Sequence, residues 1–171
     1  KLGLRATYYD VKKMNRRHQK KKDRVDPVVD FDFGPNAPFE GMNKGGFSIL
    51  CQGSILPAET GWHEFFVHSQ NGFSFWINKD GKKASIDETV TGGKEREKSI
   101  RLFLLGGRPY PIMLDFFKFK DPVAKVRLSW RPPNGKKEVI PREFLFQQSV
   151  PPSLIIQQKL PPDDSSTGFA R

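Results

Sequence analysis

The sequence predicts an all-β fold, an antiparallel β-sandwich, from its composition and from the pattern of its apolar residues. The 171 residues include 15 Phe, and the apolar positions form short alternating runs separated by 15 Gly and 14 Pro. Aromatic and β-branched side chains suit pleated sheet faces, whereas Gly and Pro mark turns, so this pattern favours sheets over a helical bundle. We expect one domain over residues 1–147, followed by a Pro-rich tail or linker over residues 148–171.

Residues 4–10 are predicted as the first strand, and the character of the chain changes after it. Eight of the thirteen residues 12–24 are Lys or Arg, with Asp23 as the one acid. A run this charged cannot lie in a core, so we predict a protruding loop. With a net charge of +10, the loop is either a solvated insertion or a contact for an anionic polysaccharide or nucleic acid. The candidate polyanion-binding residues are Lys12, Lys13, Arg16, Arg17, Lys20, Lys21 and Lys22.

Nucleic acid is the less favoured polyanion, because no aromatic residue lies between Val11 and Val25 to stack on bases. The next strand, residues 28–33, places Asp30 and Asp32 on one face. Two carboxylates are too few to hold a hard cation, so this face is predicted to be solvated. Residues 47–53 follow as a strand that contains the single cysteine, Cys51, which has no partner for an internal disulfide and is expected to be buried.

Residues 61–78 are predicted as the centre of the fold. Gln70-Asn71-Gly72 separates two aromatic-rich runs, and Asn-Gly adopts positive backbone φ at low steric cost, which indicates a β-hairpin. A one-residue slip would turn the apolar face of either strand into water, so the register is fixed. The residues expected on the inward faces are His63, Phe65, Val67, Phe73, Phe75 and Ile77.

The remaining strands are predicted by the same alternation. Residues 79–82 form a polar turn, and residues 94–98 form an exposed connection. A short apolar segment, Phe144–Phe146, is expected to pack under the sandwich. The strands of this half of the chain are predicted over residues 100–104, 110–119, 126–130 and 139–141.

Several motifs together resemble the protective-antigen-type (PA-14) domain family. Their order along the chain matches that family over about residues 3–146. The resemblance implies a β-sandwich found in secreted or surface proteins, often as a carbohydrate-binding module. Residues 160–171 also resemble a junction in large exported planctomycete proteins. The motifs include Gly3-Leu4, Tyr8-Tyr9, Gly53-x-Ile55, Asn71-Gly72, Trp76-Ile77-Asn78, Gly106-Gly107, Leu128-x-Trp130 and Ile140-Pro141.

The resemblance implies a sugar site at the tip of the predicted hairpin. In the lectin members two consecutive acids at this tip hold a calcium ion, and Gln70 and Asn71 occupy those positions here. Neutral amides do not offset the dehydration of a divalent cation, so calcium is disfavoured and no cofactor is expected. We expect direct contacts, with amides bonding hydroxyls and Trp62 or Trp76 stacking on a pyranose ring, unless these tryptophans pack between the sheets. The candidate carbohydrate-binding residues are Trp62, Gln70, Asn71, Asn78, Lys79 and Asp80.

Catalysis is not indicated by the sequence. His63 and His68 point to opposite faces of a strand and so do not share a metal ion. His63 is expected as a hydrogen-bonded core residue, and no Gly-rich phosphate loop is present. No apolar run approaches the roughly 20 residues of a membrane span, so no membrane insertion is expected.

The leading function is therefore a non-catalytic carbohydrate-binding module of an extracellular, periplasmic or cell-surface protein. Two alternatives stay open. One is a structural or protein-interaction spacer that contacts neighbouring domains of a larger protein. The other is a polyanion-binding module that uses residues 12–24.

Overall fold

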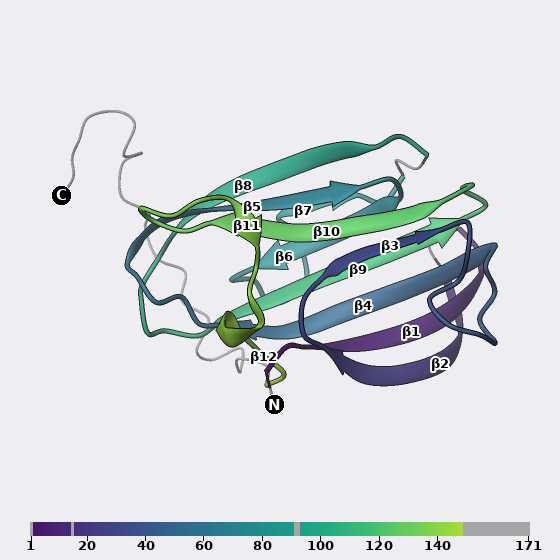
Figure 1. Ribbon diagram of the computed structural model, residues 1–171, viewed down its shortest axis with the longest axis horizontal. Helices are drawn as coiled ribbons and strands as arrows, with labels where there is room; N and C mark the ends of the chain where they lie inside the picture. The colour runs from purple at the N-terminus through teal and green to yellow at the C-terminus, as the bar shows by residue number, and fades with distance from the viewer. Residues whose placement is uncertain (1, 15, 91–92, 149–171) are drawn as a thin grey trace.

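The computed structural model describes residues 2–14, 16–90 and 93–148, which form two antiparallel sheets packed face to face (Figure 1). This confirms the predicted all-β sandwich. The predicted tail lies outside the described residues, apart from Gln148. The helical content of the described part is the three-residue 3-10 helix η1 (Arg142–Phe144), far shorter than the roughly 20 residues that a helix needs to cross a bilayer.

The larger sheet has the strand order β2-β1-β4-β9-β6-β7, with β12 paired to β4, and the smaller sheet has the order β11-β10-β5-β8, with β3 paired to β10. The strands of the larger sheet are β1 (Leu4–Lys13), β2 (Arg16–Asp26), β4 (Gly46–Ile55), β6 (Gly72–Ile77), β7 (Ile86–Glu88), β9 (Tyr110–Phe119) and β12 (Leu145–Phe146). Those of the smaller sheet are β3 (Asp30–Gly34), β5 (Gly61–Ser69), β8 (Arg96–Leu104), β10 (Ala124–Arg131) and β11 (Glu138–Val139).

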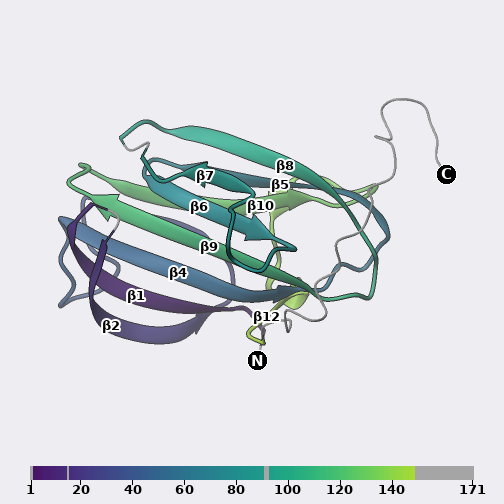
Figure 2. The same cartoon turned by 180° about the vertical axis from the view of Figure 1, so that it is seen from behind.

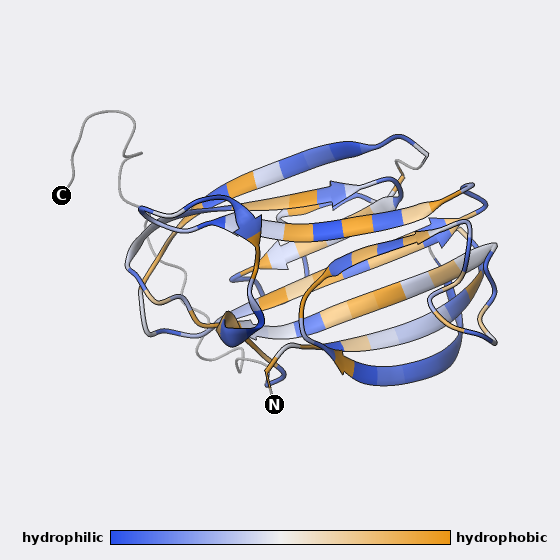
Figure 3. Cartoon of the chain, in the orientation of Figure 1, coloured by the Kyte–Doolittle hydropathy of each residue, from blue (hydrophilic) through white to orange (hydrophobic). Residues whose placement is uncertain are grey.

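The core lies where the inner faces of the two sheets meet. All six residues predicted to face inward from the segment 61–78 are buried, which confirms the alternation. Across the interface the rings of Phe65 and Phe75 lie 6.0 Å apart, and Trp130 packs 6.1 Å from Phe65. Cys51 and His63 are also buried. Figure 3 shows that the hydrophilic strands β2 and β8 lie at the edges of the sheets, where charge discourages pairing with another chain.

The predicted hairpin over residues 61–78 is wrong. β5 pairs with β8 and β10 in the smaller sheet, whereas β6 pairs with β7 and β9 in the larger sheet. The chain therefore crosses from one sheet to the other at Gln70-Asn71, as Figures 1 and 2 show. Neither Asn71 nor Gly72 adopts the positive φ of a tight hairpin turn. A hairpin and a crossover require the same alternation of apolar residues, so the pattern identified the strands but not their partners.

The loop predicted over residues 12–24 is also wrong, because most of it is strand. β2 pairs with β1 as the edge strand of the larger sheet, and we call residues 12–14 and 16–24 the basic ribbon. The Arg17 guanidinium lies 5.2 Å from the Phe117 ring centroid, and the Lys22 Nζ lies 4.1 Å from the Phe39 ring centroid. Cation–π contacts and aliphatic stems thus help to hold a highly charged strand against the rest of the domain.

Two smaller differences concern the second half of the chain. The three-residue strand β7 was not predicted, and β8 begins at Arg96, inside the expected connection 94–98. Residues 96–99 are polar on both faces and β7 has only three residues, so neither segment shows an alternating pattern. Asp30 is exposed on β3 and Asp32 lies beside it on the same strand, as predicted for a solvated face.

Candidate ligand-binding site at the crossover end

Five connections meet at one end of the sandwich, which we call the crossover end. They are the turn of the basic ribbon, the loop before β4, the β5–β6 crossover, the connection after β7 and the β9–β10 turn. Backbone hydrogen bonds join them: Lys120 N–H donates to the Gly45 carbonyl at 2.8 Å, and Gly93 N–H donates to the Gln70 carbonyl at 2.8 Å. Segments far apart in the sequence thus form one surface.

Asn71 lies at the centre of this end and is fully buried. Its Nδ2 donates to Oδ2 of Asp121 at 2.7 Å and to the Val123 carbonyl at 2.9 Å. Its Oδ1 accepts from the N–H of Lys125 at 3.0 Å. Both amide atoms are therefore occupied inside the protein, and Asn71 has no exposed atom with which to bond a sugar. The structure makes it a positioning residue for Asp121 rather than a contact residue.

Arg96 is a second residue that organises the crossover end, and the sequence analysis missed it. Its Nε donates to Glu88 Oε1 at 3.1 Å, and its NH2 donates to the Asn71 carbonyl at 3.1 Å. Its guanidinium also lies 5.5 Å from the Phe73 ring centroid. Arg96 thus joins β8 to β7 and to the crossover. An Arg in a predicted surface connection gave no signal of this role.

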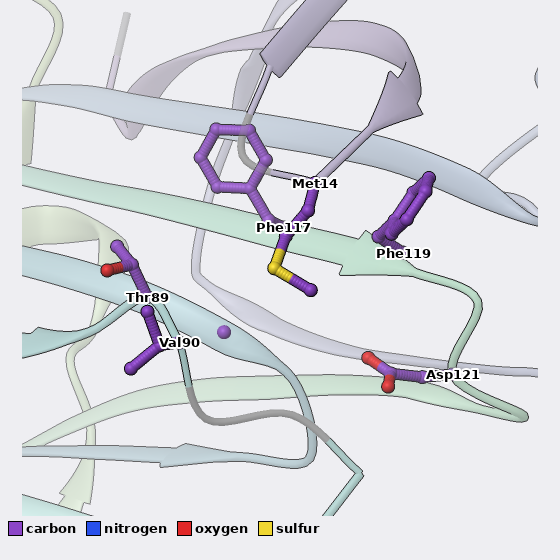
Figure 4. Close-up of a pocket in the computed structure, with 7 residues that line it drawn as sticks. Met14, Thr89, Val90, Phe117, Phe119 and Asp121 are labelled. Atoms are coloured by element: carbon purple, nitrogen blue, oxygen red, sulfur yellow. The ribbon is translucent and has the colours of Figure 1, made fainter.

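A shallow recess opens beside Asp121 (Figure 4). Phe117 and Phe119 form its apolar side, and Met14 points toward Val90 across it. Met14 is 60% exposed and Val90 is 84% exposed, although they are large apolar residues. The recess has a volume of about 50 Å³, enough for a few water molecules, so a larger ligand would rest against it by one edge.

The chemistry of the recess combines an oriented carboxylate with an aromatic surface. Asn71 holds Oδ2 of Asp121, and the structure gives Oδ1 no hydrogen-bond partner among the described residues. A carboxylate oxygen accepts hydrogen bonds from hydroxyl groups, while aromatic rings contact apolar C–H surface. A few convergent polar atoms beside an apolar wall are typical of small-molecule and sugar sites.

The structure does not bring the six predicted carbohydrate-binding residues together. Gln70 and Asn71 lie at the crossover end, whereas Trp62 begins β5 at the opposite end, about 25 Å away for a strand of this length. The segment Asn78–Asp80 leaves β6 at that opposite end, where Asn78 N–H donates to the Pro111 carbonyl. The prediction that these six residues form one sugar site at the tip of a hairpin is therefore wrong.

Trp62 is neither buried between the sheets nor open for stacking on both ring faces. It lies on the outer face of the smaller sheet, with the Arg101 guanidinium 4.8 Å from its ring centroid and Phe103 in an edge-to-face contact at 5.7 Å. Of the three tryptophans, Trp130 is the one buried between the sheets.

The basic ribbon divides into anchored and unpaired cations. Arg17 pairs with Asp115, Lys20 and Lys21 lie within 4 Å of Asp23 and Asp10, and Lys22 covers an aromatic ring. Lys12, Lys13 and Arg16, at the turn of the ribbon, are exposed and make no ion pair within residues 2–14, 16–90 and 93–148. The turn is thus the part of the ribbon whose charge is not locally neutralised.

The residues at the predicted calcium position do not fit that ion. Asn71 Oδ1 already accepts a backbone hydrogen bond, and Gln70 is neutral. In the described part of the chain, no three His, Cys, Asp or Glu residues are grouped closely enough to hold a metal. The Nδ1–H of the buried His63 donates a hydrogen bond to the Gly61 carbonyl at 2.9 Å, and burial lowers the pKa of its imidazole.

The PA14 domain family model matches residues 1–143 of the chain. The anti-sigma-I factor RsgI3 of Acetivibrio thermocellus is 31% identical over 144 residues, which are 84% of this chain and 21% of that protein. The chain therefore spans about a fifth of this curated relative.

Two solved structures extend the comparison. An anti-sigma factor domain-containing protein from Clostridium clariflavum is 25% identical with a TM-score of 0.75, and the match covers 88% of this chain and 49% of that one. A PA14 sugar-binding domain from an RTX adhesin is 12% identical with a TM-score of 0.66, covering 85% of this chain and 98% of that one. At this identity the second likeness shows the fold alone.

Proposed function

Because the chain belongs to the PA14 domain family, we propose that it is a non-catalytic carbohydrate-binding module whose site is the recess at the crossover end. The observation that carries the proposal is the carboxylate of Asp121, which Asn71 orients beside the apolar side of the recess. The proposal replaces the sugar site predicted at the tip of the hairpin, because Trp62 and Asn78–Asp80 lie at the other end of the sandwich.

The binding mode follows from the chemistry of the recess. Sugar hydroxyls donate to the partner-free oxygen of Asp121, and the C–H face of the ring rests on Phe119, which is partly exposed. Met14 and Val90 extend the apolar contact on either side. Exposed apolar side chains beside an oriented polar group favour a ligand-binding surface over an inert one. Calcium takes no part in this mode.

Two kinds of similar protein support the proposal. One protein with the same fold is a sugar-binding domain from an adhesin, which agrees with a glycan ligand and a location at the cell surface. Other relatives are anti-sigma factors, so a glycan-binding module inside a larger regulatory protein is also consistent with the family.

A glycan array with and without calcium tests the proposal. We expect binding that does not depend on calcium, and a loss of at least about tenfold in affinity for Asp121→Asn. Val90→Trp should block the recess without unfolding the chain, because Val90 is 84% exposed. Asp80→Asn, at the opposite end, serves as the matched control. Binding that survives both recess variants would place the site elsewhere, and an array with no hits would reject carbohydrate binding.

A second function, a protein-interaction domain, is favoured by the relatives that are named as anti-sigma factors. The chain spans only about a fifth to a half of them, so its neighbours in a parent protein are natural partners. Under this alternative the array gives no hits, and a neighbouring domain of the same parent binds the isolated chain. Binding, not stability, is therefore the measurement that separates the two functions.

A further inference from the structure

We propose that the carbohydrate bound at the crossover end is an anionic polysaccharide, whose acidic groups contact cations around the recess. The inference rests on the proposed function and adds the chemical class of the ligand. Its basis is the arrangement of charge in the folded chain, which the net charge of +10 does not reveal by itself.

Six exposed cations lie in the segments that meet at the crossover end, and they make no ion pair within the described residues. Two of them directly precede Met14 in the ribbon turn, and Lys120 directly precedes Asp121, with its Nζ 5.2 Å from the Phe119 ring centroid. Lys120 is therefore beside the apolar side of the recess. The six are Lys12, Lys13, Arg16, Lys44, Lys94 and Lys120.

Lys44 and Lys94 come from other parts of the chain and reach this end through the backbone hydrogen bonds of their neighbours. The residue after Lys44 accepts from Lys120 N–H at 2.8 Å. Gly93, which precedes Lys94, donates to the Gln70 carbonyl at 2.8 Å. Four separate connections thus contribute unpaired positive charge to one surface.

Several of the acids at the same end are already paired, while Asp32, Glu40 and Asp121 make no ion pair within the described residues and stand against six unpaired cations. Asp10 accepts from the Asn43 N–H at 2.9 Å and lies 3.7 Å from Lys21. Asp115 pairs with Arg17, and Glu95 pairs with Lys125 and His68. Asp121 keeps one oxygen for the sugar. The crossover end therefore carries a local excess of positive charge, which attracts and orients polyanions.

Protection of a sheet edge explains only part of this charge. Lysines along the edge strand β2 discourage pairing with another chain. Lys44, Lys94 and Lys120 lie in connections, where no edge needs protection. An anionic ligand explains why these three lysines lie at the crossover end.

The aromatic contacts favour a polysaccharide over a nucleic acid. Single-stranded nucleic acids need exposed rings on which bases stack. Beside the ribbon, the Phe39 ring is covered by Lys22, and Arg17 lies over both Tyr9 and the buried Phe117. These rings therefore do not form an exposed row on which successive bases could stack, whereas the proposed sugar contact needs only the ring of Phe119, which Lys120 also approaches.

Binding to three polymers with one backbone tests the inference: dextran, carboxymethyl-dextran and dextran sulfate. We expect both charged polymers to bind the chain at least about tenfold more tightly than dextran at about 25 mM salt. The two charged arms also distinguish carboxylate from sulfate. The triple variant Lys12→Ser, Lys13→Ser, Arg16→Ser should lose about tenfold or more in affinity for both charged polymers. The slope of its log affinity against log salt should fall in magnitude by roughly 2 to 3.

The control variant Lys82→Ser, Lys83→Ser, Lys136→Ser removes three exposed cations away from the crossover end and should change the affinity less than about twofold. Equal losses in both triple variants would reduce the effect to net charge and overturn the inference. So would tighter binding of a single-stranded oligonucleotide than of either charged dextran at about 150 mM salt. Dextran binding that requires Asp121 but not the ribbon turn would preserve the proposed function and reject the anionic ligand.

Discussion

The buried side-chain amide of Asn71 donates to Oδ2 of Asp121 at 2.7 Å, across 50 residues of sequence. Asn71 lies in the crossover between the sheets, and Asp121 lies in the β9–β10 turn, so this bond connects the two sheets at the end where the recess lies. Asn71 was predicted to contact a sugar directly. In the structure it is buried and orients the Asp121 carboxylate, which is the group proposed to bind the sugar.

Asn71→Ala should destabilise the fold strongly. It leaves the Lys125 N–H and the Val123 carbonyl without partners, and each buried unpaired group costs about 1–3 kcal/mol. We expect a loss of about 3 kcal/mol in the free energy of unfolding, measured by urea denaturation. Gln70→Ala is the control, because Gln70 bonds its neighbours through its backbone, and it should stay within about 0.5 kcal/mol of the original chain. Similar losses for both variants would refute the role given to the Asn71 side chain.

Gly72→Ala should destabilise the crossover by crowding. A Cβ at this position would lie 2.7 Å from the Thr89 carbonyl oxygen, and a backbone atom cannot move away cheaply. We expect a loss of about 1–3 kcal/mol in unfolding free energy, with weaker ligand binding because Gly72 and Thr89 both line the recess. At Gly45 the nearest atom to a Cβ is a side-chain oxygen at 3.3 Å, so Gly45→Ala should cost less. The reverse ranking would contradict this explanation.

Arg17→Met should make stability depend on pH. Burial raises the pKa of the Asp115 carboxyl above its ordinary range, and the Arg17 guanidinium opposes that shift. Without Arg17 the pKa rises further, so the fold loses stability as pH rises through the ordinary carboxyl range and regains it in acid. At pH 7 we expect a loss of about 2–3 kcal/mol, reduced at about pH 4.5.

Lys20→Met is the matched change in the same strand, because Lys20 makes a long, exposed pair with Asp23. It should alter the unfolding free energy by less than about 1 kcal/mol at either pH. A penalty for Arg17→Met that does not shrink in acid would mean that lost packing, not the buried charge of Asp115, causes it.

His63 should make the fold less stable in weak acid. Burial lowers the pKa of its imidazole from the ordinary 6.5, although the Gly61 carbonyl opposes the shift. The unfolded chain therefore binds a proton first, and folding stability declines as pH falls below about 6.5. His63→Phe should flatten this decline in urea midpoints between about pH 7.5 and 5.5, whereas His18→Gln, at an exposed position, should leave it unchanged.

The strands and their inward faces were predictable because alternation is a local property of the chain. Phe65 and Phe75 are buried as predicted, and β9 has the predicted bounds, residues 110–119. Strands whose apolar and polar residues do not alternate were not predicted as strands. The basic ribbon is charged on both faces, so only its pairing with β1 and its cation–π contacts reveal it as a strand.

The candidate site was predictable only in part. Gln70 and Asn71 were predicted as sugar contacts at the tip of a hairpin and lie at the same end as the recess without lining it, whereas Asp121, Phe119 and Arg96 carried no sequence signal. They come from connections and strand ends that are distant from Asn71 in the chain, and no local pattern records which connections share an end of a sandwich.

The sequence by itself determined a two-layered β domain, its inward-facing residues and a strong excess of positive charge. Those properties follow from residue type and spacing, which act locally. The tertiary structure decided that the chain changes sheets at Gln70-Asn71, that Asn71 is buried behind Asp121, and that cations from four connections meet around one recess. Strand pairing sets these positions, and pairing depends on contacts between residues that are distant in the chain.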